Sequence, residues 1–144
     1  MADVSKWASK TLQASLSGTA IDLNGGATIK AVPLTSAYTF DQDAHDFAAD
    51  LTNEVTTGSF TRKTLTGCAV SYNTGTNVIS WTHSAFTWTA VTGTFRQIAY
   101  IIDTGSDATS RIIKVDTFDA DKVASGNDVT VTAAAGGAAT VTVS

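Results

Sequence analysis

The stretch Phe86-Thr87-Trp88-Thr89-Ala90, followed shortly by Ile98-Ala99-Tyr100-Ile101-Ile102, decides the fold class. The first run alternates apolar and polar residues, as a strand with one buried face does. We therefore expect Phe86, Trp88 and Ala90 to face inward and the threonines to face outward. The second run is apolar on both faces, which predicts a central strand of a sheet.

Turn signals at short intervals extend this β pattern in both directions. Asn73-Thr74-Gly75-Thr76-Asn77 separates two strand-like runs, which predicts a hairpin. Pro33 cannot donate to a strand ladder, so its strand is expected to be of the edge type. Strands are expected at 28–34, 62–72, 78–83, 86–90, 97–102, 111–118, 128–132 and 140–144. This spacing predicts a single β-sandwich or jelly-roll-like domain over residues 18–144.

Two segments carry helical spacing instead. Residues 4–16 place apolar side chains at helical intervals, with Asp3 as a cap and Gly18 as a stop. We therefore expect residues 1–17 to form an N-terminal helical arm in which Trp7 is an interface anchor. A helix packed on its own sheet is the alternative. A second, short helix is expected between Ala44 and Leu51.

Composition agrees with a β domain and excludes several classes of protein. The 144 residues include 25 Thr, 12 Val and 8 Ile against 6 Leu, a profile that suits strands. The net charge is −4 and no three basic residues cluster, so we expect no nucleic-acid partner. Apolar runs reach about five residues, far short of the ~20 that span a bilayer, and no secretory signal is visible, so no membrane partner is expected.

The densest group of possible metal ligands is Asp41-Gln42-Asp43-Ala44-His45-Asp46, with Asp50 one turn further. An EF-hand is rejected, because Asp46 stands where the loop needs Gly and Thr52 where it needs Glu. A looser metal site stays open. We favour a structural interpretation in which Asp43 caps the short helix, and Asp46 and Asp50 either stay solvated or pair with a cation of a neighbouring subunit. The candidate interface residues are Trp7, Asp41, Asp43, His45 and Asp46.

Other chemistry finds little support in the sequence. The single Cys68 excludes an intrachain disulfide and a cysteine zinc site, and it is expected as a small buried side chain. His83 is expected in the core or at its rim. The chain holds no Gly-x-Ser-x-Gly, phosphate-loop or dinucleotide motif, so we expect no catalysis and no cofactor. An aromatic sugar-binding face is the less favoured alternative to core packing for four residues: Trp81, Phe86, Trp88 and Tyr100.

Ala133-Ala134-Ala135-Gly136-Gly137-Ala138-Ala139 is the one low-complexity stretch. We expect it to be a flexible loop between the last two strands, with a loop that contacts a neighbouring subunit as the alternative.

One region of the sequence holds three distinctive segments in succession: Thr28-Ile29-Lys30-Ala31-Val32-Pro33-Leu34, Ser36-Ala37-Tyr38-Thr39 and Asp41-Gln42-Asp43-Ala44-His45-Asp46-Phe47. These segments resemble a family of small structural proteins of tailed bacteriophages. The family pattern there is roughly T-I-K-V-A-L, then S-Y-T, then D-x-D-x-H-D-F. Thr64-Leu65-Thr66-Gly67 with its following strand, Phe86-Thr87-Trp88-Thr89-Ala90 and the run 99–110 fit as well, so the match covers about residues 20–118.

The resemblance implies a virion component without catalytic residues. We expect a capsid decoration (cement) protein that is made in the bacterial host cytoplasm and binds the outside of the shell. Its partner would be the major capsid protein, and it would associate as a trimer because such sites lie on threefold or quasi-threefold axes. The alternative is a structural part of the tail or neck, or a host-adhesion module that binds carbohydrate.

Overall fold

The computed structural model describes residues 3–134 and 137–144, which form a mostly β protein with one short helix near the N-terminus. The elements in chain order are β1 (Val4–Trp7), α1 (Ser9–Leu16), β2 (Ile29–Leu34), the 3-10 helix η1 (Ala48–Asp50), β3 (Lys63–Thr64), β4 (Ala69–Asn73), β5 (Val78–Thr82), β6 (Phe86–Ile102), β7 (Ile112–Thr132) and β8 (Thr140–Val143). No helix in the described part of the chain is both long and apolar enough to cross a membrane.

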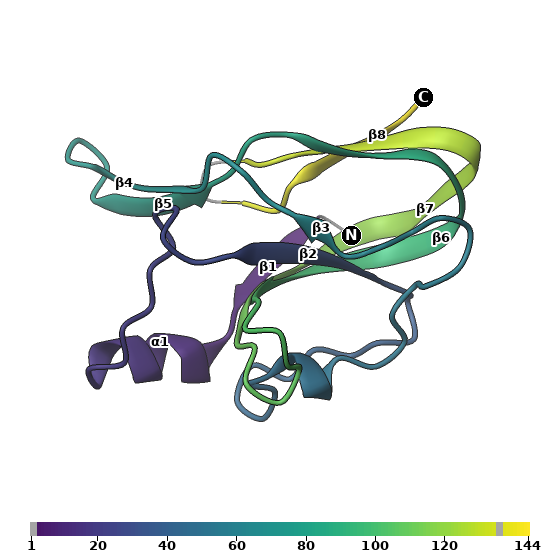
Figure 1. The fold of residues 1–144 in the computed structure, drawn as a ribbon. Helices are drawn as coiled ribbons and strands as arrows, with labels where there is room; N and C mark the ends of the chain where they lie inside the picture. Colours follow the sequence, from purple (N-terminus) through teal and green to yellow (C-terminus); the bar gives the residue numbers. More distant parts are fainter. Residues whose placement is uncertain (1–2, 135–136) are drawn as a thin grey trace.

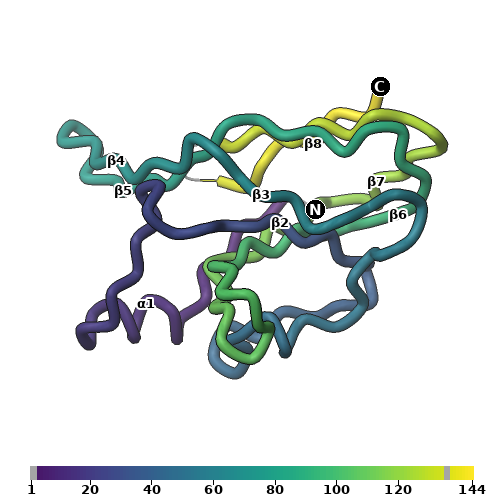
Figure 2. The backbone as a smooth tube through the Cα atoms, in the orientation of Figure 1, coloured from purple at the N-terminus to yellow at the C-terminus, as the bar shows by residue number. Residues whose placement is uncertain are grey.

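The main sheet is antiparallel and open, with strand order β1-β7-β6-β2-β3, and β8 pairs with the second half of β7. Its centre is the ladder between β6, of 17 residues, and β7, of 21 residues. These two strands curve strongly, so that the end of β7 and β8 lie above β2 and the start of β7 (Figure 1). Figure 2 shows the same curl in the backbone trace. The expected sandwich of two separate facing sheets is therefore replaced by one curled sheet, beside which the β4–β5 hairpin stands as a second, two-stranded sheet.

The curl arises at irregularities in the β6–β7 register. The register shifts four times along the ladder, and two of these shifts flank Val91. Extra residues of this kind bend a strand and increase its twist. Ala90 lies at this bend with a φ of 50° and is exposed, so the expectation that it faces inward is wrong. Trp88 is buried and Phe86 is partly buried, as the alternating pattern predicted.

Two hydrophobic clusters fill the faces of the curled sheet. The larger lies inside the curl and brings together aromatic residues that meet edge to face, among them Phe60, Trp88 and Phe95. Trp88 also donates from Nε1 to the Thr61 carbonyl oxygen at 2.7 Å. The smaller cluster covers the opposite face of the sheet and includes Ala99 and Ile101. The 97–102 segment is therefore buried on both faces, which confirms the predicted central strand.

Three further strand predictions are corrected by the structure: the continuity of 62–72, the separation of 111–118 from 128–132, and the edge position of the strand with Pro33. The 62–72 strand is broken at Gly67, where φ is 60° and a Cβ would collide with Ser84 Oγ, so β3 and β4 are separate. The strands expected at 111–118 and 128–132 are one continuous strand, β7. The β4–β5 hairpin and β8 are confirmed. The strand with Pro33 is second from the edge, because β3 pairs with it at Lys30 and Ala31; Pro33 itself lies beyond that pairing.

The N-terminal segment is the largest departure from the predicted secondary structure. Residues 4–7 are not helical but form β1, which pairs with β7 so that Val4 faces Thr117 and Trp7 faces Lys114. The helix begins only at Ser9. Pairing with a strand far along the chain overrides the local helical spacing, as tertiary contacts often do. The expected arm therefore enters the main sheet, and the short helix expected from Ala44 shrinks to the 3-10 turn η1.

Gly58 provides a test of the turn that precedes β3. Its φ is 62°, and a Cβ there would lie 1.6 Å from the Thr92 carbonyl oxygen. We expect Gly58→Ala to lower the free energy of unfolding by several kcal/mol, because backbone atoms must move. Gly105, with φ of 86° and nothing within 4 Å, is the matched control. Gly105→Ala should cost only about 1–2 kcal/mol, the ordinary price of a left-handed residue. Equal losses in urea denaturation would contradict the predicted close approach.

Candidate interaction surface

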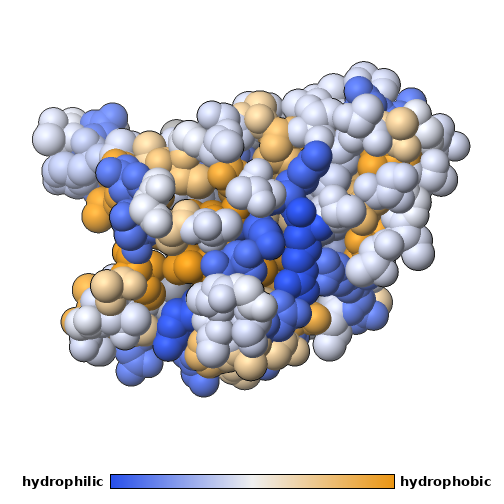
Figure 3. All heavy atoms as spheres, viewed as in Figure 1, coloured by the Kyte–Doolittle hydropathy of each residue, from blue (hydrophilic) through white to orange (hydrophobic). Residues whose placement is uncertain are grey.

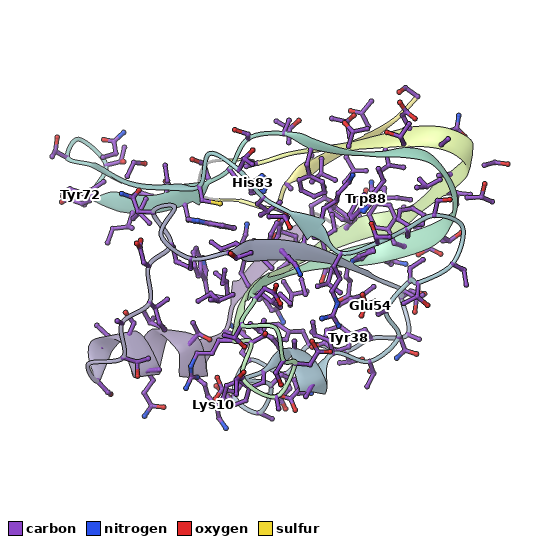
Figure 4. The ribbon with its side chains drawn as sticks, viewed as in Figure 1. Lys10, Tyr38, Glu54, Tyr72, His83 and Trp88 are labelled. Carbon is purple, nitrogen blue, oxygen red and sulfur yellow. The ribbon has the colours of Figure 1, made fainter. Side chains whose placement is uncertain are left out.

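One face of the β4–β5 hairpin is apolar, and the other is mostly polar but includes Ala69 and Val78. Residues that lie opposite each other in an antiparallel pair share a face, and the register places Val70 opposite Trp81 and Tyr72 opposite Ile79. Trp81, near the base of the hairpin, is only 4% exposed, whereas Tyr72 and Ile79 near its tip are 57% and 71% exposed. The apolar face is thus covered at its base and uncovered at its tip, where Tyr72 is labelled in Figure 4.

This face continues into a hollow between the hairpin and α1, which we call the Trp7 groove. It has a volume of about 270 Å³ and is lined mainly by apolar side chains, including Trp7, Leu12, Ile21, Leu23 and Val70. Figure 3 shows apolar atoms gathered here, at the left, between the projecting hairpin and the helix. Trp7 is 43% exposed, and its ring meets Trp81 edge-on at 6.5 Å. The expected anchor residue therefore lies within an exposed apolar surface.

Contacts with β7 hold the Trp7 groove in place. The backbone N–H of Ala8 donates to the Ile113 carbonyl oxygen at 2.9 Å, and the Thr11 hydroxyl donates to the Ile112 carbonyl oxygen. Thr11, not Leu12 or Leu16, is the buried residue of α1. The helix thus turns its leucines outward, and Trp7 stands on a rigid support instead of a loosely attached arm.

Carboxylates in the loop 41–50 bind their own backbone. Asp41 Oδ1 accepts the N–H groups of Asp43 and Ala44 at 2.9 and 3.1 Å, and Asp50 Oδ2 accepts those of Asp46 and Phe47 at 2.9 and 3.0 Å. These backbone hydrogen bonds lower the pKa of Asp41 and of Asp50. Asp50 therefore caps η1 and Asp41 closes the turn before it, so the expectation that Asp43 caps a helix is wrong.

The remaining acidic and histidine candidates also have partners in this chain. Asp46 pairs with Arg111, so it does not need a cation from a neighbouring subunit. His45 accepts at Nδ1 from the Tyr38 hydroxyl at 2.9 Å and stacks on that ring. Burial, followed by the charges of Asp50 and Asp41, raises the pKa of Tyr38. Within the described residues, no three His, Cys, Asp or Glu side chains are placed to hold a metal ion.

One residue that the sequence analysis did not single out joins this loop to Trp7. The Gln42 side chain donates from Nε2 to the Trp7 carbonyl oxygen at 2.9 Å, and the backbone carbonyl oxygen of Gln42 accepts the Ser9 N–H at 3.2 Å. The structure thus brings the candidate residue Trp7 to the same part of the molecule as the 41–46 loop. Asp43 stays exposed on that loop. No local pattern identifies Gln42, because its partners lie 35 residues away in the chain.

A buried ion pair underlies the surface near Trp7. Lys114 Nζ lies 3.2 Å from Asp116 Oδ1 and 3.4 Å from Ser5 Oγ, and it stands over the Tyr100 ring at 5.0 Å. Asp116 is fully buried, and its Oδ2 accepts the Ala139 N–H at 2.9 Å. The pair thereby ties β7 to β1 and to the segment before β8. The low-complexity loop that leads to this segment includes residues 135–136, which lie outside the described residues.

The aromatic residues considered for a sugar-binding face are core residues instead. Trp81, Trp88 and Tyr100 are buried, and Phe86 packs against the same cluster. His83 lies between Trp81, Phe86 and Tyr100 and is buried, which confirms the predicted core position (Figure 4). Cys68 is half-buried at the edge of this cluster, where burial raises the pKa of its thiol.

Comparison with known proteins adds no relative: no family model, no curated protein and no solved structure matches this chain.

Neutralising the buried Asp116 should destabilise the protein much more than neutralising an exposed aspartate. Asp116→Asn leaves a buried ammonium without its counter-charge, so we expect it to lower the free energy of unfolding by about 3–5 kcal/mol. The exposed pair of Lys122 with Asp119, whose charged atoms lie 3.7 Å apart, is the control. Asp119→Asn should cost less than about 1 kcal/mol. Thermal or urea unfolding measures both, and a small effect of Asp116→Asn would contradict the buried-pair assignment.

Because His83 is buried, we predict that the folded protein loses stability in mild acid. Burial lowers its pKa below the ordinary 6.5, and the Lys114 charge acts in the same direction, whereas the Ser84 carbonyl and Asp116 oppose it. A lowered pKa means that protonation favours the unfolded chain. The contribution of His83 is therefore complete above about pH 6.5 and declines as the pH falls below that value. Urea midpoints at about pH 7.5 and about pH 5 should differ less in His83→Gln than in the wild type; an unchanged difference would refute this assignment.

Proposed function

We propose that this protein is a non-enzymatic structural component of a bacteriophage virion that binds the outside of the capsid and stabilises the shell. The resemblance of residues 28–47, 86–90 and 99–110 to small structural proteins of tailed bacteriophages supports the virion assignment. The partner would be the major capsid protein, with neither nucleic acid nor a membrane involved. The protein would be made in the bacterial cytoplasm and end on the particle.

The observation that carries the proposal is the exposed apolar surface formed by the Trp7 groove and the hairpin face. Contiguous exposed apolar surface on a soluble protein commonly marks a protein–protein interface. Tryptophan and tyrosine are enriched among residues that dominate binding energy, and Trp7 and Tyr72 fit that role. A groove fixed beside the curled sheet is suited to dock on a preformed shell. We propose that the two halves of this sheet act as the two layers of a sandwich-like body.

Stabilisation would then follow from linkage. A protein that binds only the intact shell stabilises it by RT ln(1 + [L]/Kd) per site, so contacts that span neighbouring capsid subunits raise the free energy of opening. The resemblance further suggests that copies associate as trimers at threefold positions. Neither part of this mechanism needs a catalytic group.

The test is to add the purified protein back to particles that lack it. Wild-type protein should bind and raise the rupture temperature of full particles. Trp7→Ala and Ile79→Ser should bind at least about tenfold more weakly, because each removes apolar contact. Val123→Ala, a change at an exposed apolar residue of β7 that does not line the Trp7 groove, should bind like the wild type. Circular dichroism of each variant verifies folding.

Two outcomes would overturn this proposal. Rupture temperatures that stay unchanged after full add-back would remove the stabilising role. Location of the protein only at the tail or neck, with loss of host attachment when it is missing, would favour the alternative of a tail component or carbohydrate-binding adhesion module. In that case Trp7, the exposed aromatic ring of the groove, is the residue to test against sugars.

A further inference from the structure

The outer edge of β4 presents backbone groups that point away from the molecule. The Val70 N–H donates to Asn24 Oδ1 at 3.0 Å, so it faces away from β5. Because strand residues alternate in direction, the N–H and C=O of Tyr72, two positions on, also face outward. Outside the strand ladders, the Tyr72 N–H has no backbone hydrogen bond within the described residues, and all five residues of β4 are exposed. Beyond Val70, no strand of the described residues therefore pairs with the outer edge of β4.

The usual protection of an exposed strand edge is missing here. Proteins commonly protect such edges with charged side chains, proline or a covering segment. No Asp, Glu, Lys or Arg occurs between Lys63 and Arg96, and the single proline is Pro33. The hairpin also projects from the body of the molecule, which leaves its tip accessible (Figure 1). An isolated two-stranded hairpin is only marginally stable, so further strand pairing would stabilise it.

We propose that β4 pairs with β4 of a second copy of this chain, antiparallel, about a two-fold axis at Tyr72. A two-fold contact places the same residue of each copy face to face, so the two Tyr72 residues would exchange both backbone hydrogen bonds. The combined four-stranded sheet would carry Tyr72 and Ile79 of both copies on one apolar face.

Charge favours a second copy as the occupant of this edge. Each chain carries a net charge of −4, so contacts between charged surfaces of two copies would be opposed by like-charge repulsion. The uncharged stretch from residue 64 to residue 95 avoids that repulsion. The Tyr72 hydroxyl is already directed within its own chain, since it donates to Asn77 Oδ1 at 2.7 Å. Its ring is thus held on the hairpin face, ready to pack against its symmetry mate.

This contact uses Tyr72 and Ile79, which also belong to the proposed capsid surface, but dimerisation is measured in solution without particles, so its failure would leave the capsid proposal standing. The contact makes a dimer, whereas a threefold ring would need a different surface. A hairpin edge buries less than the roughly 800 Å² per partner of a standard interface, so we expect a dissociation constant in the micromolar range. Sedimentation equilibrium of the purified protein up to high micromolar concentration should therefore show a reversible monomer–dimer equilibrium.

A charge exchange at Tyr72 tests the geometry directly. Tyr72→Lys alone and Tyr72→Glu alone should each dimerise about tenfold more weakly, because like charges would face each other across the axis. An equimolar mixture of the two variants should regain dimers, since opposite charges then face each other. Val123→Lys, which adds a charge on β7, should dimerise like the wild type.

Circular dichroism and melting temperatures of the variants separate misfolding from lost pairing. A wild-type protein that stays monomeric throughout the range, or that forms trimers without dimers, would overturn the proposal. So would a mixture of the two Tyr72 variants that fails to regain association while both variants are folded.

Discussion

The antiparallel ladder between β6 and β7 is the interaction on which the rest of the structure depends. Its 97–102 half accepts β2 on one side, while the start of β7 accepts β1 and the end of β7 accepts β8. The register shifts around Val91 turn one half over the other, and the space between them is filled by interlocking aromatic rings such as Trp88 and Phe95. Neither half could bury its apolar face alone, so the bend and the core require each other.

The same ladder connects the core to the exposed surface. Lys114 of β7 lies opposite Trp7 of β1, and its charge is balanced by Asp116 two residues further along the same strand. Asp116 in turn holds the backbone that leads into β8. A buried ion pair contributes little net stability, but breaking it is costly, so it fixes one arrangement of the strands. Through Lys114, which lies 3.4 Å from Ser5 Oγ, the pair also connects β7 to the strand that carries Trp7.

Local patterns predicted the parts of the fold whose partners are close in sequence. The turn at 73–77 joins neighbouring strands, and the two-sided apolar run at 97–102 could only be a central strand. The strand β1 could not be found this way, because Val4 and Trp7 show helical spacing while their partners lie more than 100 residues further on. The burial of Asp116 could not be predicted from the sequence either. Charged residues usually lie at the surface, and only the assembled sheet shows that this one is buried.

For the candidate site, the sequence identified Trp7 but not what surrounds it. The exposed tip of the hairpin depends on which residues the body leaves uncovered, and Gln42 reaches Trp7 only because the 41–46 loop lies against the end of strand β1. The acidic loop at 41–50 drew attention through its composition, yet backbone N–H groups and Arg111 account for Asp41, Asp46 and Asp50. A cluster of potential ligands in a sequence is therefore a weak guide where turns can use the same oxygens.

An electron-microscopy map of the purified particle tests the central claim most directly. The account predicts density for this protein on the outer surface of the capsid, with the Trp7 groove and the apolar face of the β4–β5 hairpin turned toward the major capsid protein. Density found only at the tail or neck, or density on the shell with that surface facing solvent, would contradict it.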